Sequence, residues 1–457
     1  MYVADTIAAI ATPPGCGGIG IVRISGPQAE QIGTSIFLGK SGGGFDSHRL
    51  YYGHFIDPAD ASMIDEGMAV LMRAPRSYTR EDVLELHSHG GYLVVRRVLH
   101  ACVVAGARLA DPGEFTRRAF LNGRIDLCQA ESVLDLINSR TDAALSLAQR
   151  QREGLLGREL EVVRRLTAEA LAIVEAHIDF PDEEIDSASL MLVTERITSA
   201  RQLLVRLVDS FRLGKVLREG VSVVLAGKPN AGKSSLLNAL ACEERAIVSA
   251  IPGTTRDMIE EIVTIEGLPV RIVDAAGIRR HFADEIEQEG IRRTLGMLAE
   301  ADLVLFLADG SHPLDADDLE ILSALAGKPF VTVITKSDLP QLLDRSALPV
   351  CLAQVSVSSR SGFGLDELRS ALYSYFMQDA PQLSDDLVAI SNTRHRDVLT
   401  RTLSALDLYS MHGEQCFSPD LLAIDLRESL SALGELTGET TPEAVLDLIF
   451  STFCIGK

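Results

Sequence analysis

The sequence predicts a chain of α/β plus all-α character. An α/β domain is expected at residues 1–122, a helical domain in two pieces at 123–218 and 381–457, and a second α/β domain at 219–380. The first part is rich in glycine and mixes strand-like and helix-like runs, whereas both helical pieces carry apolar residues at helical spacing. Because both ends of the second α/β domain join helices, we expect it to be inserted into the helical domain.

Elements in the N-terminal part follow from apolar patterning. Residues 19–24 and 67–72 are apolar runs typical of strands, and residues 92–99 carry the apolar stripe of a helix. The glycine-rich stretch 41–44 predicts a loop.

Helical periodicity begins near residue 126, breaks at 180–184 and predicts another helix from about 188 to 217. It returns after the inserted domain, and Pro442 behind a threonine predicts the first turn of a last helix. The apolar positions that carry this pattern are Val133, Leu134, Ile137, Leu145, Leu147, Leu155, Leu156, Leu160, Val398, Leu399, Leu403, Leu406 and the segment 421–436.

Residues 227–234, Gly-Lys-Pro-Asn-Ala-Gly-Lys-Ser, match the P-loop pattern G-x-x-x-x-G-K-[ST]. They stand between an apolar run typical of a buried strand, 221–226, and a helical run, 235–240. The glycines let backbone N–H groups turn toward phosphate oxygens, and the helix start adds partial positive charge. We expect Lys233 to reach the outer phosphates and the Ser234 hydroxyl to hold Mg²⁺.

A second motif predicts which base is bound. The apolar run 331–334 ends in Thr335-Lys336-Ser337-Asp338, similar to the N/T-K-x-D guanine motif of GTPases. The Asp338 carboxylate can accept hydrogen bonds from guanine N1–H and the exocyclic amine, a donor pair that adenine lacks. Thr335 replaces the usual asparagine, which predicts a weaker anchor for this loop. The segment Ser358-Ser359-Arg360 is expected to contact the base through its backbone.

Two switch-like motifs complete the set. The strand-like run 270–273 ends in Asp274-Ala275-Ala276-Gly277, a D-x-x-G sequence, in which Asp274 is expected near Mg²⁺ and the Gly277 N–H near the γ-phosphate. Upstream, residues 253–257 supply a switch threonine. Four motifs in this order predict a P-loop GTPase domain with a Ras-like parallel sheet.

One expected catalytic residue is missing, because Ile278 stands where Ras-like proteins place a water-orienting glutamine. An arginine finger is worth about 10³–10⁵ in rate, so another group must supply that charge or hydrolysis is slow. Asn230 either binds a monovalent cation beside the phosphates or only caps the loop. The acidic run 284–287 either offers a general base or forms a solvated helix start.

Composition limits the class of protein further. Hydrophobic residues make up 46% of the 457, and the net charge is −21. Any nucleic-acid contact must therefore be local, at Arg96-Arg97, at Arg117-Arg118 with Arg124, or at 279–281, unless these are solvated faces. The seven cysteines lack regular spacing, and neither a signal peptide nor a membrane span is evident, so a cytoplasmic location is expected.

Beyond the GTPase motifs, further specific segments occur at both ends of the chain: 5–15, Arg23-Ile24-Ser25-Gly26, 77–79 with 81–83, 89–91, 112–116 with 118–122, and the closing Phe453-Cys454-Ile455-Gly456-Lys457. With these segments, the chain resembles the MnmE (TrmE) family of tRNA-modification GTPases over nearly its full length.

The resemblance implies an N-terminal tetrahydrofolate-binding and dimerisation domain, a helical domain and an inserted G domain. It implies a K⁺-dependent GTP hydrolase that forms a homodimer and joins an MnmG-type FAD/NADH flavoprotein in a heterotetramer. Together they would add an aminomethyl or carboxymethylaminomethyl group to C5 of the wobble uridine of certain tRNAs. A derivative such as 5,10-methylene- or 5-formyl-tetrahydrofolate would donate the one-carbon unit, and GTP hydrolysis would drive or license the reaction.

Site residues carry over position by position. The potassium ligands would be Asn230, Ser249, the Ile251 carbonyl and Thr254; Mg²⁺ would be held by Ser234 and Thr255. Catalysis would fall to Lys233 and to Glu287, as the water-activating glutamate. The full set expected at GTP is Asn230, Ala231, Gly232, Lys233, Ser234, Ser235, Ser249, Ala250, Ile251, Pro252, Gly253, Thr254, Thr255, Asp274, Ala275, Ala276, Gly277, Thr335, Lys336, Ser337, Asp338, Ser358, Ser359 and Arg360.

For folate, the resemblance points to Arg23, Glu81, Arg124 and Lys457, with Arg124 neutralising a glutamate tail and Glu81 bonding a pterin edge. Cys454 is a candidate nucleophile toward uridine C6, or a small near-terminal residue with no chemistry. The alternative function is a ribosome-assembly or signalling GTPase switch without modification chemistry, which would need no folate pocket.

Overall fold

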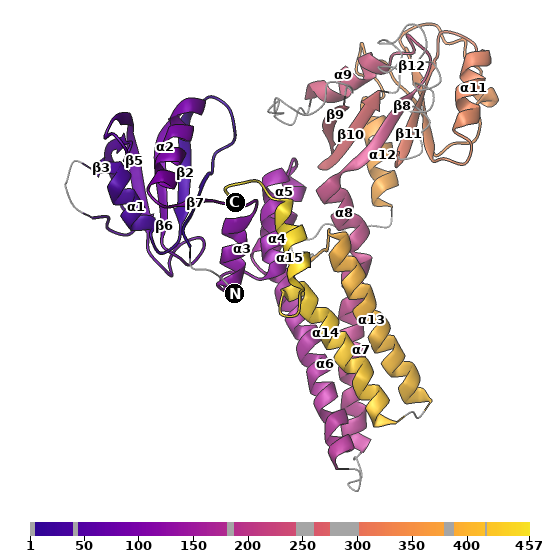
Figure 1. Cartoon of the computed structure of the whole chain (residues 1–457). Helices are drawn as coiled ribbons and strands as arrows, with labels where there is room; N and C mark the ends of the chain where they lie inside the picture. Colours follow the sequence, from indigo (N-terminus) through magenta and orange to yellow (C-terminus); the bar gives the residue numbers. More distant parts are fainter. Residues whose placement is uncertain are drawn as a thin grey trace, which may run out of the picture. The chain divides into compact units, whose positions relative to one another are not determined.

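A computed structural model describes residues 5–39, 44–180, 187–243, 260–274, 301–378, 388–415 and 418–457 (Figure 1). The chain forms two compact units. One comprises residues 1–134, 151–200 and 401–457, and the other comprises 135–150 and 201–400. One unit therefore interrupts the other along the sequence. The domain boundaries given above, at residues 122, 218 and 380, stay predictions.

The N-terminal part of the first unit contains a seven-stranded sheet in the order β3-β4-β5-β6-β2-β1-β7. Neighbouring strands are antiparallel except β1 and β7, which run parallel. The predicted strands at 19–24 and 67–72 lie inside β2 and β5. The strand bounds are β1 Ile7–Ile10, β2 Gly17–Ser25, β3 Phe37–Gly39, β4 Leu50–Ile56, β5 Met63–Met72, β6 Val83–Gly90 and β7 Arg108–Leu109.

Helices α1 (Ala29–Ile36) and α2 (Tyr92–Val104) pack on this sheet. Alternate residues of β6, among them Leu84 and Leu86, are fully buried because strand side chains point to opposite faces in turn. They join Val95 and other α2 residues in one apolar core. The helix predicted at 92–99 is confirmed and continues to Val104.

The rest of the first unit is helical, and some of the helices have residues in both units. Buried residues of α6 recur every three or four positions, from Leu156 to Val174, which places them on one face. Helix α14 packs on α6 and carries a similar buried stripe that ends at Gly438 in a left-handed cap. The helix bounds are α3 Glu114–Leu121, α4 Leu127–Asn138, α5 Asp142–Arg152, α6 Leu155–Asp179, α7 Ser187–Asp209, α8 Phe211–Glu219, α13 Thr393–Glu414, α14 Pro419–Thr437 and α15 Glu443–Ser451.

The single helix predicted from about 188 to 217 is wrong, because the structure has two helices that part at Ser210. The Ser210 hydroxyl lies 2.6 Å from the carbonyl oxygen of Leu207 and accepts the backbone N–H of Ile390 at 3.2 Å. Such local side-chain bonds compete with the helical ladder. The apolar periodicity continues across the break, so it gave no sign of it.

The second unit contains a six-stranded sheet in the order β13-β12-β11-β8-β10-β9, parallel except for edge strand β9. Central strands such as β11 are buried at almost every residue, since a parallel sheet is covered on both faces. The bounds are β8 Val221–Ala226, α9 Lys233–Glu243, β9 Glu260–Ile265, β10 Leu268–Asp274, β11 Leu303–Asp309, α11 Ala316–Ala324, β12 Phe330–Thr335, η2 Arg345–Ala347, β13 Gln354–Ser356 and α12 Leu365–Met377.

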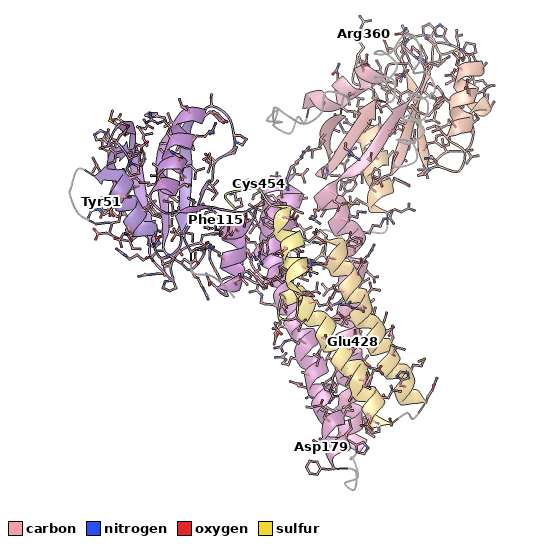
Figure 2. All side chains as sticks on the ribbon, viewed as in Figure 1. Tyr51, Phe115, Asp179, Arg360, Glu428 and Cys454 are labelled. Carbon is pink, nitrogen blue, oxygen red and sulfur yellow. The ribbon has the colours of Figure 1, made fainter. Side chains whose placement is uncertain are left out.

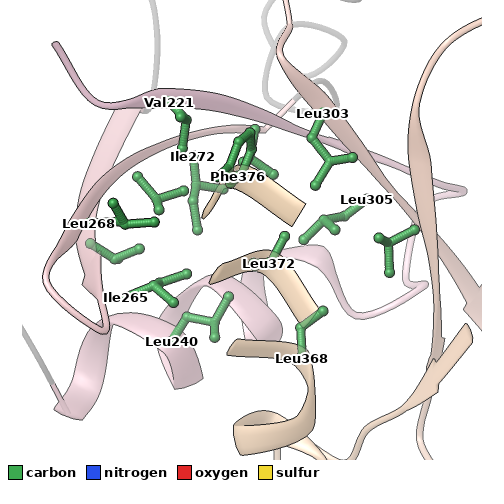
Figure 3. Close-up of a cluster of buried hydrophobic side chains, with 14 of the residues drawn as sticks. Val221, Leu240, Ile265, Leu268, Ile272, Leu303, Leu305, Leu368, Leu372 and Phe376 are labelled. Carbon is green, nitrogen blue, oxygen red and sulfur yellow. The ribbon is translucent and has the colours of Figure 1, made fainter. Parts of the chain in front are cut away.

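Figure 3 shows the core on one face of this sheet, where Leu240 of α9 and Leu368 and Leu372 of α12 meet the side chains of β8 to β11. Strand residues whose side chains point to the other face of the sheet, such as Phe306, form a second apolar cluster. This cluster includes side chains of α11 and of the segments beside it. The two clusters bury the ends of β8 and β12, from which the P-loop and the segment after Thr335 continue. No helix within the described ranges is both long and apolar enough to span a bilayer.

Candidate functional site

The loop between β8 and α9 has the backbone that the P-loop motif requires. Gly227, Asn230 and Gly232 all have positive φ, at 157°, 66° and 96°. At Gly227 a Cβ atom would lie 2.7 Å from the carbonyl oxygen of Leu307, so only glycine fits there. The loop turns back on itself through the Ala231 N–H, which donates to the carbonyl oxygen of Lys228 at 3.2 Å.

Lys233 begins helix α9 and lies over this loop. Its residue is only 6% exposed, and its Nζ donates to the carbonyl oxygens of Gly227 at 2.5 Å and Lys228 at 2.6 Å. The next two residues, Ser234 and Ser235, are exposed. Lysine and hydroxyl therefore stand together at a helix N-terminus, where an anion is favoured and a hydroxyl is accessible to a cation.

Thr335 ends β12 and contacts the P-loop directly. Its hydroxyl lies 2.7 Å from the carbonyl oxygen of Ala231 and 3.2 Å from that of Ala308. The side chain is buried and bonded to the phosphate loop, so threonine does anchor this loop; that it anchors the loop more weakly than asparagine stays a prediction. Further support for the base loop comes from the Ser337 N–H, which donates to the Val357 carbonyl oxygen at 3.1 Å.

Asp338 and Ser358 come together from two separate loops. The Ser358 hydroxyl donates to Asp338 Oδ1 at 2.8 Å, and Ser358 itself is buried. This hydrogen bond lowers the pKa of the exposed Asp338 carboxyl. An ionised carboxylate with accessible lone pairs is the acceptor that guanine needs. Arg360 follows Ser358 by two residues and has an exposed side chain. Figure 2 shows it at the edge of the part of the chain that contains the six-stranded sheet.

Lys336 lies between these residues with a positive φ of 55°, and its Nζ is 2.6 Å from Asp309 Oδ2 at the end of β11. Burial raises the pKa of Asp309, but hydrogen bonds from Lys336 and Ser311 outweigh it and lower that pKa to about 2. The ion pair therefore persists at neutral pH and fixes the base loop to the neighbouring strand.

Several predicted site residues lie outside the described residues. They are Ser249, Ala250, Ile251, Pro252, Gly253, Thr254, Thr255, Ala275, Ala276, Gly277 and Glu287. Asp274 is the last residue of β10 and is paired in register with Leu225 of β8, which lies two residues before Gly227, the first residue of the P-loop. For the residues outside the described ranges, the assignments to K⁺, Mg²⁺ and water activation stay predictions.

A second cluster forms in the N-terminal part of the first unit, around Tyr78. The guanidinium carbons of Arg23 and Arg124 lie 5.6 Å and 4.8 Å from the centre of the Tyr78 ring, within cation–π range. Arg124 Nη1 also donates to the Tyr78 carbonyl oxygen at 2.7 Å. Two predicted folate residues therefore share one aromatic ring, although they are far apart in sequence.

Glu85 orients Arg23 and is a residue that the sequence argument missed. Arg23 Nε and Nη2 both lie 2.9 Å from Glu85 Oε1, and the two residues are directly opposite each other on β2 and β6. The hydrogen bond from His87 and the charge of Arg23 outweigh desolvation and lower the pKa of Glu85. Alternation along a predicted sheet could have suggested the pair only if the strand register were known.

Glu81, the third predicted folate residue, is already bonded within the protein. Its Oε2 accepts the Ser25 hydroxyl at 2.7 Å and lies 3.2 Å from Arg118 Nη1. Arg118 is 1% exposed and also pairs with Asp5 and Glu114. The suggestion that Arg118 belongs to a nucleic-acid patch is therefore wrong, because a buried guanidinium surrounded by carboxylates cannot contact a phosphate backbone.

The last residues of the chain reach the same part of the first unit. The Phe115 N–H donates to the Lys457 carbonyl oxygen at 3.2 Å, and Arg23 Nη1 donates to that of Gly456 at 3.4 Å. Gly456 has a φ of 94°, and any Cβ there would collide with the Ile10 carbonyl oxygen. The Cys454 thiol is free and exposed, and Figure 2 labels it beside Phe115. Arg23, Glu81 and the Lys457 carbonyl thus each contact a residue of α3, and the backbone N–H of Arg124 donates to the carbonyl oxygen of Ala119 in the same helix.

The parallel sheet, the P-loop at its carboxyl edge and the adjoining guanine loop define a P-loop GTPase domain inserted in a helical one. Two family models match: the MnmE helical domain over residues 127–454, and the GTP-binding protein TrmE N-terminus over residues 6–124. The chain belongs to the MnmE family.

Relatives named tRNA modification GTPase MnmE match over the full length. The protein of Geobacter sulfurreducens is 54% identical over 457 residues, which is 100% of each chain. That of Geobacter metallireducens is 52% identical over 458 residues, also 100% of each. That of Streptococcus pneumoniae serotype 2 is 42% identical over 454 residues, 99% of each.

Proposed function

We propose that this chain, as a tRNA modification GTPase, binds and hydrolyses GTP. It would do so as part of an enzyme that modifies C5 of the wobble uridine of certain tRNAs. The observation that carries the proposal is the full-length similarity to relatives of that name, at 54% identity in the first case. The joined phosphate and guanine loops support the GTPase part, because Thr335 and Ala231 place the two loops in contact.

Each part of GTP has a group of suitable chemistry in this site. Asp338 would accept the guanine N1–H and amine, and Lys233 would leave its carbonyl partners for the phosphates. Ser234 and Thr255 would hold Mg²⁺, which supplies positive charge at the β- and γ-phosphates when bound. The exposure of Ser234 at the helix start supports this role, because a hydroxyl is a hard oxygen ligand.

A potassium ion would be held by Asn230, Ser249, the Ile251 carbonyl and Thr254. These are all oxygen donors, and Asn230 already holds the left-handed conformation that turns the loop. Glu287 would then activate the attacking water. We expect GTP turnover to be many times faster in KCl than in NaCl, and Glu287→Ala to bind GTP but hydrolyse it far more slowly. Equal turnover in the two salts would contradict the potassium assignment.

The cluster around Tyr78 suits a folate. Two guanidinium groups close to one aromatic ring combine positive charge with an aromatic side chain, which suits a ligand with a planar ring and a carboxylate tail. We propose that Arg23, Glu81, Arg124 and Lys457 contact 5,10-methylene- or 5-formyl-tetrahydrofolate, and that Cys454 is the candidate nucleophile. Equilibrium binding of 5-formyltetrahydrofolate to the full chain should be lost in Arg23→Ala. No binding to the wild type would favour a switch without modification chemistry.

The proposed partners are a second copy of the chain, an MnmG-type FAD/NADH flavoprotein in a heterotetramer, and tRNA. Nucleoside analysis of tRNA from cells that lack the protein tests the whole proposal. We expect loss of the aminomethyl and carboxymethylaminomethyl uridines, with recovery by the wild type and not by Lys233→Ala. An unchanged set of modified uridines in the deletion strain would reject it.

A further inference from the structure

A lysine in the P-loop is tied by its side chain to the start of helix α11. Lys228 Nζ lies 2.6 Å from Asp315 Oδ2 and 2.8 Å from Asp318 Oδ2. All three residues belong to the unit that contains the six-stranded sheet. The side chains of Lys228 and Asp318 are only 19% and 5% exposed. The charges are therefore weakly screened by solvent, and each is costly to leave unpaired.

The two carboxylates are held in place by the first turn of α11. Asp315 caps this helix, and its Oδ1 accepts the N–H groups of Asp317 and Asp318 at 3.1 Å and 3.2 Å. Asp318 Oδ2 in return accepts the Asp315 N–H at 3.3 Å, which completes a capping box. Asp318 Oδ1 is buried without a hydrogen-bond partner among the described residues. The Lys228 ammonium is thus the cation that offsets this buried carboxylate.

The backbone of the same lysine shapes the phosphate loop. Its carbonyl oxygen accepts the Ala231 N–H at 3.2 Å and Lys233 Nζ at 2.6 Å. The side chain of Lys228 is therefore fixed to one helix, while its carbonyl group orients the lysine at the start of another. Burial lowers the pKa of Lys228, but hydrogen bonds to the two aspartates outweigh it and raise that pKa. The tether accordingly stays charged at neutral pH.

We propose that Lys228 is a positioning residue of the nucleotide site: its ion pair with Asp315 and Asp318 holds the P-loop backbone ready for phosphate without touching the nucleotide. This inference rests on the proposed GTP binding. The alternative role for this lysine is direct phosphate binding, in which the ammonium group leaves the aspartates and contacts the nucleotide. The two roles predict opposite effects when the carboxylates are removed.

Titration of the full-length protein with a fluorescent GDP analogue separates them. Lys228→Met should weaken binding by about tenfold, as expected if only about a tenth of the molecules then keep the P-loop in its phosphate-ready conformation. The pair Asp315→Asn with Asp318→Asn should weaken it similarly, whereas Lys228→Arg should keep affinity within about twofold. Lys215→Met, which removes a half-exposed lysine of the same unit, is the matched control. Unchanged or tighter binding after both aspartates are neutralised would overturn the inference.

Thermal melting distinguishes a role of Lys228 in folding stability alone from a role in nucleotide affinity. Lys228→Met leaves the Asp318 charge buried and should lower Tm, and adding Asp318→Asn should restore Tm while affinity stays weak. Recovery of both Tm and affinity in that double variant would show a structural role only, and overturn the inference. Wild-type protein that fails to bind the analogue would instead reject the proposed function. Wild-type binding with unaltered affinity in Lys228→Met would reject only the role of Lys228.

Discussion

The hydroxyl of Thr335 lies 2.7 Å from the carbonyl oxygen of Ala231, so the guanine loop is tied to the phosphate loop across 104 residues of sequence. Both residues are buried, at 3% and 2% exposed. A hydrogen bond in such surroundings is not replaced by water when it is lost, and the carbonyl group then stays unpaired. The two halves of the nucleotide site are therefore linked by a direct hydrogen bond within the protein.

Thr335→Val keeps the side-chain shape and removes this bond. We expect unfolding free energy to fall by about 1–2 kcal/mol and GDP affinity to fall several-fold, because the buried carbonyl loses its donor. Urea unfolding and fluorescent-GDP titration measure the two effects. Thr332→Val, in the same strand and also buried, removes a hydroxyl that donates to Cys351 Sγ at 3.5 Å. Equal losses of GDP affinity in both variants would contradict a specific role for Thr335.

Asp338→Asn should change which base is bound. The Ser358 hydroxyl can still donate to the Asn oxygen, so the loop should keep its position. The amide group loses one acceptor and gains a donor, which mismatches the guanine amine and suits the 2-oxo group of xanthine. We expect GDP affinity to fall about 100-fold or more and XDP affinity to rise. Competition titrations with both nucleotides would contradict this if GDP remained preferred.

Stability of the guanine loop should depend on pH through Asp309. Its folded pKa of about 2 lies below the ordinary value of 3.8, so its contribution is present above pH 4 and is lost as pH falls toward 2. Urea midpoints of wild type and Asp309→Asn should differ most at pH 5 to 7 and converge below pH 4. Asp366→Asn, whose side chain is 98% exposed, serves as control. A difference that grows on acidification would refute the ion pair.

Gly456→Ala should release the C-terminal tail from its position. A Cβ at this left-handed residue would collide with the Ile10 carbonyl oxygen, so the backbone must shift. The Phe115 N–H then loses its acceptor, the Lys457 carbonyl. Hydrogen exchange at Phe115 should become faster, and folate affinity should fall. Gly413→Ala, at a helical glycine with open space around it, should change neither property.

Arg118→Met should strongly destabilise the N-terminal domain. It leaves the carboxylates of Asp5, Glu81 and Glu114 without the buried cation that they share. Removing one partner of a buried ion pair costs about 3–5 kcal/mol, which urea unfolding would detect. Arg97→Met, at an exposed position of the same domain, should cost little. A loss of less than about 1 kcal/mol for Arg118→Met would mean that the cluster is not stabilising.

The sequence by itself determined the elements and the backbone of the phosphate loop. Strand β8, helix α9 and the glycines between them lie where the local pattern places them, because periodicity and left-handed conformations are properties of neighbouring residues. The same patterns indicated the inserted arrangement and, through the resemblance, the family. They did not reveal the break at Ser210, whose hydroxyl accepts a hydrogen bond from the Ile390 N–H, 180 residues away.

The tertiary structure alone decided which distant residues meet. Lys228 pairs with Asp318, and Arg23 meets Gly456 across 433 residues, because strand order and helix packing bring those segments together. Burial then changes the meaning of a residue type: Arg118 resembles a surface cation in the sequence and is the buried centre of an ion-pair cluster in the fold. Contacts of this kind depend on three-dimensional distance and dielectric surroundings, which no local pattern of side chains encodes.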